Sequence, residues 1–145
     1  MKLSSRTRYG MRAMLELAMD YGKGPVQIKT ISQREDISNK YLEQLIAMLK
    51  AAGFVRSLRG PKGGYTLDRP PEQISLLEIF TTLEGPMLDV ECLRHPEFCS
   101  RCSDCATRFV WARLQKAIAD TLKGMTLKDL AERGMSLCGN KNYQI

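Results

Sequence analysis

The chain has 145 residues, of which 43% are hydrophobic, and it carries a formal net charge of +6. This length suits one domain, or one domain with an appendage, and the hydrophobic content excludes a disordered chain. No apolar run reaches the roughly 18 residues of a membrane span, and the N-terminal segment MKLSSRTRYG lacks the apolar core of a secretory signal, so we expect a cytoplasmic protein.

The positive charge is concentrated in the first half of the chain. Residues 1–70 contain 13 Lys and Arg against 6 Asp and Glu, whereas residues 71–145 contain 9 against 10. A basic region suits a polyanion, because each phosphate that it neutralises releases counterions. We therefore predict that residues 1–70 bind nucleic acid.

Two helices are predicted over Ser4–Tyr21 and Val26–Asp36. Apolar residues recur at helical spacing over much of the first helix, so it should be largely buried. In the second helix, Ile28 and Ile31 are the apolar anchors.

A third helix is predicted from Ser38, a good N-cap, to Ala52, with Gly53 placed to end it. Its apolar side chains gather on one side, and they are Leu42, Leu45, Ile46 and Leu49. The opposite side begins with Lys40 and Gln44 and ends in alanines, which suits a helix entering a DNA major groove N-terminus first. For this segment alone, the alternative is an ordinary amphipathic surface helix.

The segment after this helix predicts a β-hairpin. Phe54–Leu58 and Tyr65–Leu67 are strand-like and flank the Gly- and Pro-rich turn Arg59–Gly64. A helix pair followed by a hairpin is the winged helix-turn-helix arrangement, in which Arg59 and Lys62 can reach a neighbouring groove or the DNA backbone. The alternative for the turn is a solvated loop without a partner.

The second half predicts helices around an irregular loop. Ser75 and Glu78 form a capping-box pattern for a short helix to about Leu83, and residues 84–103 have no clear period. The longest helix is predicted over Asp104–Lys123. Its broad apolar face consists of Val110, Leu114, Ala117, Ile118, Thr121 and Leu122, and we expect Phe109 and Trp111 to widen it.

This long apolar face predicts a homodimer, because the chain offers too little protein to cover it. Such a dimer would place two recognition helices on a palindromic double-stranded DNA site, with half-sites about 34–36 Å apart. The alternative is a helix packed within its own subunit. A short last helix is predicted from Thr126 to about Arg133, followed by a polar, mobile tail that contains the isolated Cys138.

Four cysteines follow the pattern C-x6-C-x2-C-x2-C at Cys92, Cys99, Cys102 and Cys105. Thiolates bind iron and zinc readily, and a loop can fold several of them around one metal group. The widely spaced pairs of a zinc ribbon are missing. The ferredoxin pattern is also missing, because position 109, where its last cysteine would fall, is Phe.

The segments SRTRYGMRAML, SNKYLEQL and RGPKGGY, followed by the cysteine loop, closely resemble the IscR-like iron-sulfur cluster regulators. These belong to a family of dimeric winged-helix repressors that includes the nitric-oxide sensor NsrR and the cysteine-metabolism repressor CymR. The resemblance covers residues 1 to about 134 and is strongest in the DNA-binding half. It implies a mainly α fold, with a winged helix-turn-helix over residues 1–70 and the cysteine loop and dimerisation helices over residues 71–145.

The resemblance assigns Cys92, Cys99 and Cys105 as ligands of an iron-sulfur cluster. It favours [2Fe-2S] and leaves [4Fe-4S] open. The chain departs from the pattern in three ways: the first gap is one residue longer, Cys102 is additional, and the positions of the relatives' fourth ligands hold Arg108 and Arg8. The fourth ligand therefore remains open among Cys102, His95, Glu43 and Glu91.

The predicted function is a cluster-sensing, sequence-specific transcriptional regulator of iron-sulfur cluster biogenesis genes. The residues predicted to face DNA are Ser38, Lys40, Tyr41, Glu43 and Gln44 in the helix and Arg59, Gly60 and Lys62 in the wing. The alternative is a thiol- or zinc-responsive repressor of the same family. We expect no enzyme, because the sequence shows no nucleophile–base pair or paired carboxylates at catalytic spacing.

Overall fold

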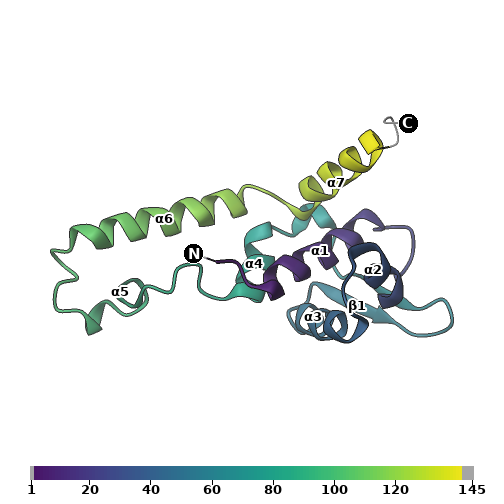
Figure 1. The fold of residues 1–145 in the computed structure, drawn as a ribbon, viewed down its shortest axis with the longest axis horizontal. Coiled ribbons are helices and arrows are strands. Elements are labelled where there is room, and N and C mark those ends of the chain that lie inside the picture. The colour runs from purple at the N-terminus through teal and green to yellow at the C-terminus, as the bar shows by residue number, and fades with distance from the viewer. Residues whose placement is uncertain (1, 142–145) are drawn as a thin grey trace.

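The computed structural model describes residues 2–141 and is mainly helical, with one two-stranded sheet in that range (Figure 1). The first three helices and the sheet are α1 (Ser5–Met19), α2 (Ile28–Glu35), α3 (Asn39–Ala51), β1 (Val55–Leu58) and β2 (Gly64–Leu67). The remaining helices are α4 (Leu76–Glu84), α5 (Glu91–Arg94), α6 (Ala106–Lys123) and α7 (Leu127–Lys141). The predicted winged helix-turn-helix with a long C-terminal helix is confirmed.

The helix pair α2–α3 is joined by a very short turn. Asp36 ends α2 in the left-handed conformation (φ 53°), and Ser38 caps α3 by accepting a hydrogen bond from the Tyr41 amide at 3.2 Å. The apolar residues predicted for α3 are all at most 1% exposed, and three of them, Leu42, Ile46 and Leu49, lie in the main core with residues of α1 and α4. Burial of this stripe fixes which face of α3 points outward.

The wing is held to the body by a contact that the sequence pattern did not reveal. Val26 pairs with Tyr65 as an isolated antiparallel bridge, with both N–H···O=C hydrogen bonds at 2.8 Å. Gly64 makes this approach possible, because a Cβ there would lie 2.5 Å from the Val26 carbonyl oxygen. The hairpin therefore stands at a fixed angle beside the helix pair.

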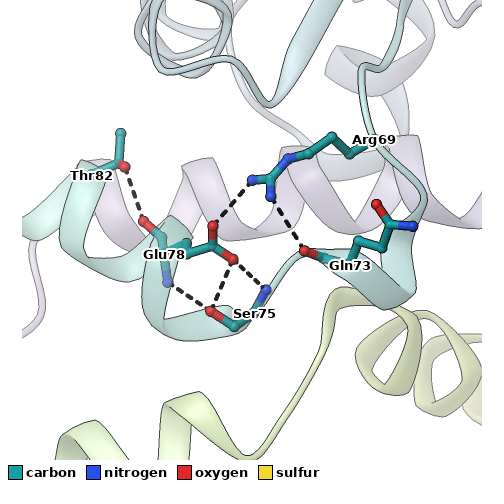
Figure 2. Close-up of polar contacts among 5 residues, drawn as sticks. All are labelled: Arg69, Gln73, Ser75, Glu78 and Thr82. Carbon is teal, nitrogen blue, oxygen red and sulfur yellow. Dashed lines mark hydrogen bonds and ion pairs between the residues drawn. The ribbon is translucent and has the colours of Figure 1, made fainter.

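The predicted capping box at the start of α4 is confirmed (Figure 2). The Ser75 hydroxyl accepts from the Glu78 amide, and the Glu78 carboxylate accepts from the Ser75 amide at 2.9 Å. Arg69, which follows the wing, donates to Glu78 and to the carbonyl of Gln73. The start of α4 is thereby joined to the segment that follows the wing.

The end of α4 is joined to the start of α1. The Glu84 carboxylate accepts hydrogen bonds from the Ser4 amide and hydroxyl and from the buried Thr7 hydroxyl. These donors lower the pKa of Glu84, the Thr7 hydroxyl having the largest effect. Gly85 follows with φ 84° and ψ −143°, a conformation almost restricted to glycine, and begins the cysteine loop.

The predicted short last helix is wrong in extent, because α7 continues to Lys141. The Thr126–Asp129 cap that starts it is confirmed. Gly134 directly follows the predicted end at Arg133, but it lies inside α7, where a Cβ would stand 3.3 Å from side-chain atoms of Leu15 and Met19 in α1. The glycine permits close packing of α7 on α1, and residues 134–141 are helical, whereas the rest of the predicted tail, residues 142–145, lies outside the described residues.

Candidate nucleic-acid interface and cysteine loop

The exposed face of α3 contains the side chains predicted to meet DNA. Lys40, Glu43 and Gln44 are exposed, as is the capping residue Ser38, and Ala47 continues the face with a small side chain. A face that is polar at its N-terminal end and small further on allows close approach to base edges in a major groove. The structure thus leaves the predicted side chains free to reach a duplex.

Tyr41 differs from its neighbours because it is half-buried. Its ring meets the ring of Tyr9 edge-on at 6.0 Å, and the guanidinium groups of Arg8 and Arg12 lie within 6 Å of that Tyr9 ring. Tyr41 therefore connects α3 to the N-terminal half of α1 as well as standing at the edge of the exposed face.

The wing tip presents Arg59, Gly60 and Lys62 to solvent. Gly60 adopts φ 111°, and its carbonyl accepts from the Gly63 amide at 2.9 Å, which closes the turn. At the base of the hairpin, Lys50 of α3 donates to Ser57 of β1 at 2.9 Å. The two cationic side chains of the tip, Arg59 and Lys62, are exposed and can contact an anionic partner that lies beside α3.

Sequence reasoning missed the ion pairs that fix the helix pair. Arg12 of α1 binds Glu35 of α2, while Arg34 of α2 binds Glu16 and Asp20 of α1 at 3.1 and 2.9 Å. Burial raises the pKa of Glu16, with Glu35 adding to the effect and Arg34 opposing it. Single charges at long sequence separation give no signal of such pairing in one sequence.

The cysteine loop occupies residues 85–105, between α4 and α6, and contains α5 and a 3-10 turn at Pro96–Phe98. Its four thiols are all free and half-buried. Cys102 lies with its sulfur 3.6 Å from the carbonyl oxygen of Cys92. Burial raises the pKa of Cys102, the Arg108 charge lowers it, and the nearby Cys99 and Cys92 thiols raise it further.

Cys105 has a different environment at the N-cap of α6. Its sulfur lies 3.1 Å from the Thr107 hydroxyl, and hydrogen bonds from Thr107 and the Arg108 amide hold its pKa below the usual value. His95 faces Glu97 at 3.3 Å and packs on Phe98.

Within residues 2–141, no three His, Cys, Asp or Glu side chains converge as a metal site. The predicted ligands Cys92, Cys99 and Cys105 thus lie on one loop, but their side chains do not converge on one point where a metal could bind. The donor set suits iron or zinc chemically, because thiols are soft ligands and these four are free and partly accessible. They lie on a short segment that begins at Gly85, whose backbone can change conformation easily. Ligation would require the loop to close around the metal group.

Arg108 stands where the resembled proteins have a histidine ligand, and the structure gives it another contact. Its Nε donates to the Cys92 carbonyl at 3.3 Å, which fastens the first turn of α5 to the start of α6. Arg108 is therefore a residue that organises the loop, a role that its position in the sequence did not indicate.

The helix α6 extends away from the body formed by α1–α4, and the loop with α5 runs beside it (Figure 1). None of its 18 residues is buried, and its apolar stripe includes Val110, Trp111 and Leu114, which are 40–52% exposed. Phe109 was predicted to widen this stripe, and that prediction is wrong. Its ring lies beneath the Arg113 guanidinium at 5.6 Å, on the charged side of the helix.

An apolar groove of about 380 Å³ lies between the end of α4 and the second half of α6. Its walls include Leu3, Phe80, Met87, Ile118 and Leu122. The groove continues the exposed stripe of α6 toward the body, so apolar surface remains uncovered in the single chain. Among the described residues, no helix is long and apolar enough to cross a membrane.

Comparison with known proteins gives a consistent result. Residues 3–133 match the family model Rrf2, described as an iron-dependent transcriptional regulator. The chain is 42% identical over 131 residues to the transcriptional regulator CymR of Bacillus subtilis, with 90% of each chain covered. It is 38% identical to the regulator IscR of Sodalis glossinidius, covering 90% of this chain and 78% of the relative.

Two solved structures extend the likeness to three dimensions. The structure of CymR, described as the global cysteine regulator of B. subtilis, matches with a TM-score of 0.79 and 41% identity over 92% of this chain and 98% of that one. The structure of IscR from T. potens matches with a TM-score of 0.76 and 37% identity over 92% and 88%.

Proposed function

This chain belongs to the Rrf2 family of transcriptional regulators, and we propose that it acts as a homodimeric, iron-sulfur cluster-sensing regulator of iron-sulfur cluster biogenesis genes. Its relatives are regulators and not enzymes, and the chain is a DNA-binding transcriptional regulator of the winged-helix type. The observation that carries the proposal is the combination of an outward-facing polar surface on α3 with a thiol-rich loop in the same chain.

DNA recognition is assigned to α3 and the wing. Gln44 has the geometry to bond adenine with two hydrogen bonds, and Lys40 can donate to guanine or to a phosphate. Glu43 repels most base acceptors, so it restricts the sequences that the protein tolerates. Ser38 and Tyr41 flank this set, and Arg59, Gly60 and Lys62 approach the neighbouring groove or backbone.

The partner of α6 is a second copy of this chain. An 18-residue helix is about 27 Å long, and the apolar stripe on α6 is exposed over its first half, at Val110, Trp111 and Leu114. A symmetric pair of such helices would cover each other's stripes and present two α3 helices to one face of a palindromic duplex. The uncovered groove beside α4 supports this assignment.

The cluster is assigned to Cys92, Cys99 and Cys105, with Cys102 or His95 as the fourth ligand. The assignment favours [2Fe-2S] and leaves [4Fe-4S] open. A bound cluster would supply a redox- and oxygen-sensitive group whose presence depends on iron. Closure of the loop would act on Gly85 and Glu84, and Glu84 connects directly to Ser4 and Thr7 at the start of α1. The DNA-binding half would then respond to the state of the loop.

The test is anaerobic purification followed by an absorption spectrum and counts of iron and acid-labile sulfide per chain. The proposal expects visible absorption bands with nearly equal iron and sulfide, lost in Cys92→Ala and retained in the matched control Cys138→Ala. Colourless protein without sulfide, even after anaerobic reconstitution, would contradict it.

A thiol- or zinc-responsive regulator is the second candidate. Two observations favour it: the thiols do not share one focus within residues 2–141, and the similar B. subtilis protein is described as a cysteine regulator. Bound zinc without sulfide, or DNA affinity that changes with thiol oxidation in protein that never contains iron, would select this reading.

A further inference from the structure

We propose that Cys99 and Cys102 form a reversible intramolecular disulfide when the cluster-free protein meets a hydroperoxide. Cys102 is the cysteine that the resembled pattern does not contain, so that pattern assigns it no role. The bond depends on the geometry of this segment alone, whereas its consequence for sensing rests on the proposed function.

The backbone between the two cysteines already has the required shape. The Cys102 amide donates to the Cys99 carbonyl at 3.2 Å, which makes residues 99–102 a hydrogen-bonded β-turn. Such a turn keeps its first and last Cα atoms within about 7 Å, and disulfides span Cα distances of about 4.4–6.8 Å. The two thiols can therefore join with little movement of the flanking chain.

The neighbouring side chains also favour this pair. Cys99 is joined to Cys102 by the hydrogen bond of the turn, whereas Cys92 meets the Cys102 sulfur through its main-chain carbonyl at 3.6 Å. The Cys105 thiol is engaged with Thr107 at the start of α6. Cys138 lies on α7, at the opposite end of the molecule from α5 (Figure 1).

The reaction transfers two electrons from the two sulfurs to the peroxide. One thiolate attacks a peroxide oxygen, an S–O bond forms, the O–O bond breaks, and the alcohol or water leaves with a proton. The second thiol then attacks the sulfenic sulfur, forming the S–S bond and breaking the S–O bond. Its proton leaves with the hydroxide as water, so two thiols and one hydroperoxide give one disulfide, one alcohol and one water.

The disulfide would withdraw Cys99 from the proposed ligand set. Oxidised, cluster-free protein would then be unable to accept a new cluster until a thiol reductant reopened the bond. Cys102 would thus keep the chain in the cluster-free state for as long as peroxide persists.

The sequence allows a direct test, because Arg101 stands between the two cysteines. Trypsin separates them into the peptides 95–101 and 102–108, so a disulfide appears as a joined pair that is two hydrogens lighter than the sum of the reduced peptides. Full-length, reduced, metal-free protein is treated with one equivalent of hydrogen peroxide, remaining thiols are alkylated, and the digest is analysed by mass spectrometry.

The 102–108 peptide also contains Cys105, so serine variants decide between the two thiols. We expect the joined pair in wild type, Cys105→Ser and Cys138→Ser, and its absence in Cys102→Ser and Cys99→Ser. A pair that persists in Cys102→Ser, a bond to the peptide containing Cys92, or sulfinic acid without any disulfide would each overturn the proposal.

This outcome is independent of cluster binding. If the joined peptide pair forms in protein that never binds iron, the disulfide is supported and the proposed cluster sensing is contradicted. If the protein binds a cluster but no joined pair forms, the disulfide is contradicted and the proposed cluster sensing is unaffected. If the protein binds a cluster, peroxide-treated cluster-free protein should be reconstituted with a cluster only after dithiothreitol has reduced the disulfide. Equal reconstitution without dithiothreitol would show that the disulfide does not block cluster binding.

Discussion

The wing should depend on Gly64 more than on any side chain of the hairpin. In Gly64→Ala, the new Cβ would lie 2.5 Å from the Val26 carbonyl oxygen and 2.7 Å from its carbon. These are backbone atoms, so no rotamer change can relieve the contact. Either the wing or the segment around Val26 must move.

The expected cost has two parts. The positive φ of Gly64 costs a residue with a side chain about 1–3 kcal/mol. Separation of Val26 from Tyr65 removes two hydrogen bonds, for about another 1–3 kcal/mol. Gly60→Ala is the matched control, because its φ is 111° but no atom lies within 4 Å of its Cβ. It should incur the backbone cost alone.

Urea and thermal unfolding, followed by circular dichroism at one protein concentration, measure the difference. At about 3 °C per kcal/mol for a chain of this size, Gly64→Ala should melt about 3–9 °C below Gly60→Ala. Its DNA affinity should also fall further, because the wing would lose its angle to α3. Equal melting temperatures of the two variants would refute the proposed role of the Val26–Tyr65 bridge.

Four further predictions concern the proposed function. Gln44→Ala should weaken binding to a selected duplex about 5- to 150-fold, or about 1–3 kcal/mol, with little change on random duplex; equal losses on both would deny base reading. Lys62→Ala should lower the slope of log affinity against log salt by about one on every duplex, and an unchanged slope in the salt titration would remove its phosphate contact. Trp111→Glu should convert the dimer to monomer in sedimentation, and a stable dimer would place the interface elsewhere. The Thr7 and Ser4 donors lower the pKa of Glu84, so the contribution of Glu84 to folding stability is fully present above the ordinary value of 4.5 and is lost as pH falls through the lowered pKa. The free energy of unfolding should therefore decline less toward acid in Glu84→Gln than in wild type. Parallel pH curves for the two proteins would contradict this.

The winged helix-turn-helix in the N-terminal half was predictable because its signals are local. Ser38, the apolar spacing of α3 and Gly53 define both ends and the buried side of one helix within 16 residues. The hairpin was found to within one residue at its strand ends for the same reason. The Val26–Tyr65 bridge was not found, since it joins residues far apart in sequence and needs no distinctive side chain.

The second half was less predictable because long-range packing overrides local pattern there. Gly134 is a helix-ending signal in isolation, and only its contact with Leu15 and Met19 shows why it lies inside α7. The spacing of the cysteines showed a thiol-rich loop, but it did not show that a turn joins Cys99 to Cys102 or that Cys105 stands at the N-cap position of α6. Side-chain direction in a loop without a period follows from contacts with Arg108 and Thr107, which the spacing does not encode.

The most direct test of the account compares one protein in two states on one duplex. A binding sequence is selected from a random duplex library with cluster-loaded protein under anaerobic conditions, and its affinity is then measured by fluorescence anisotropy for loaded and cluster-free protein at the same salt concentration. Coupling between the loop and α3 predicts dissociation constants that differ by about 5-fold or more. Equal dissociation constants for the two states, on that duplex and on duplexes selected with the cluster-free protein, would contradict it.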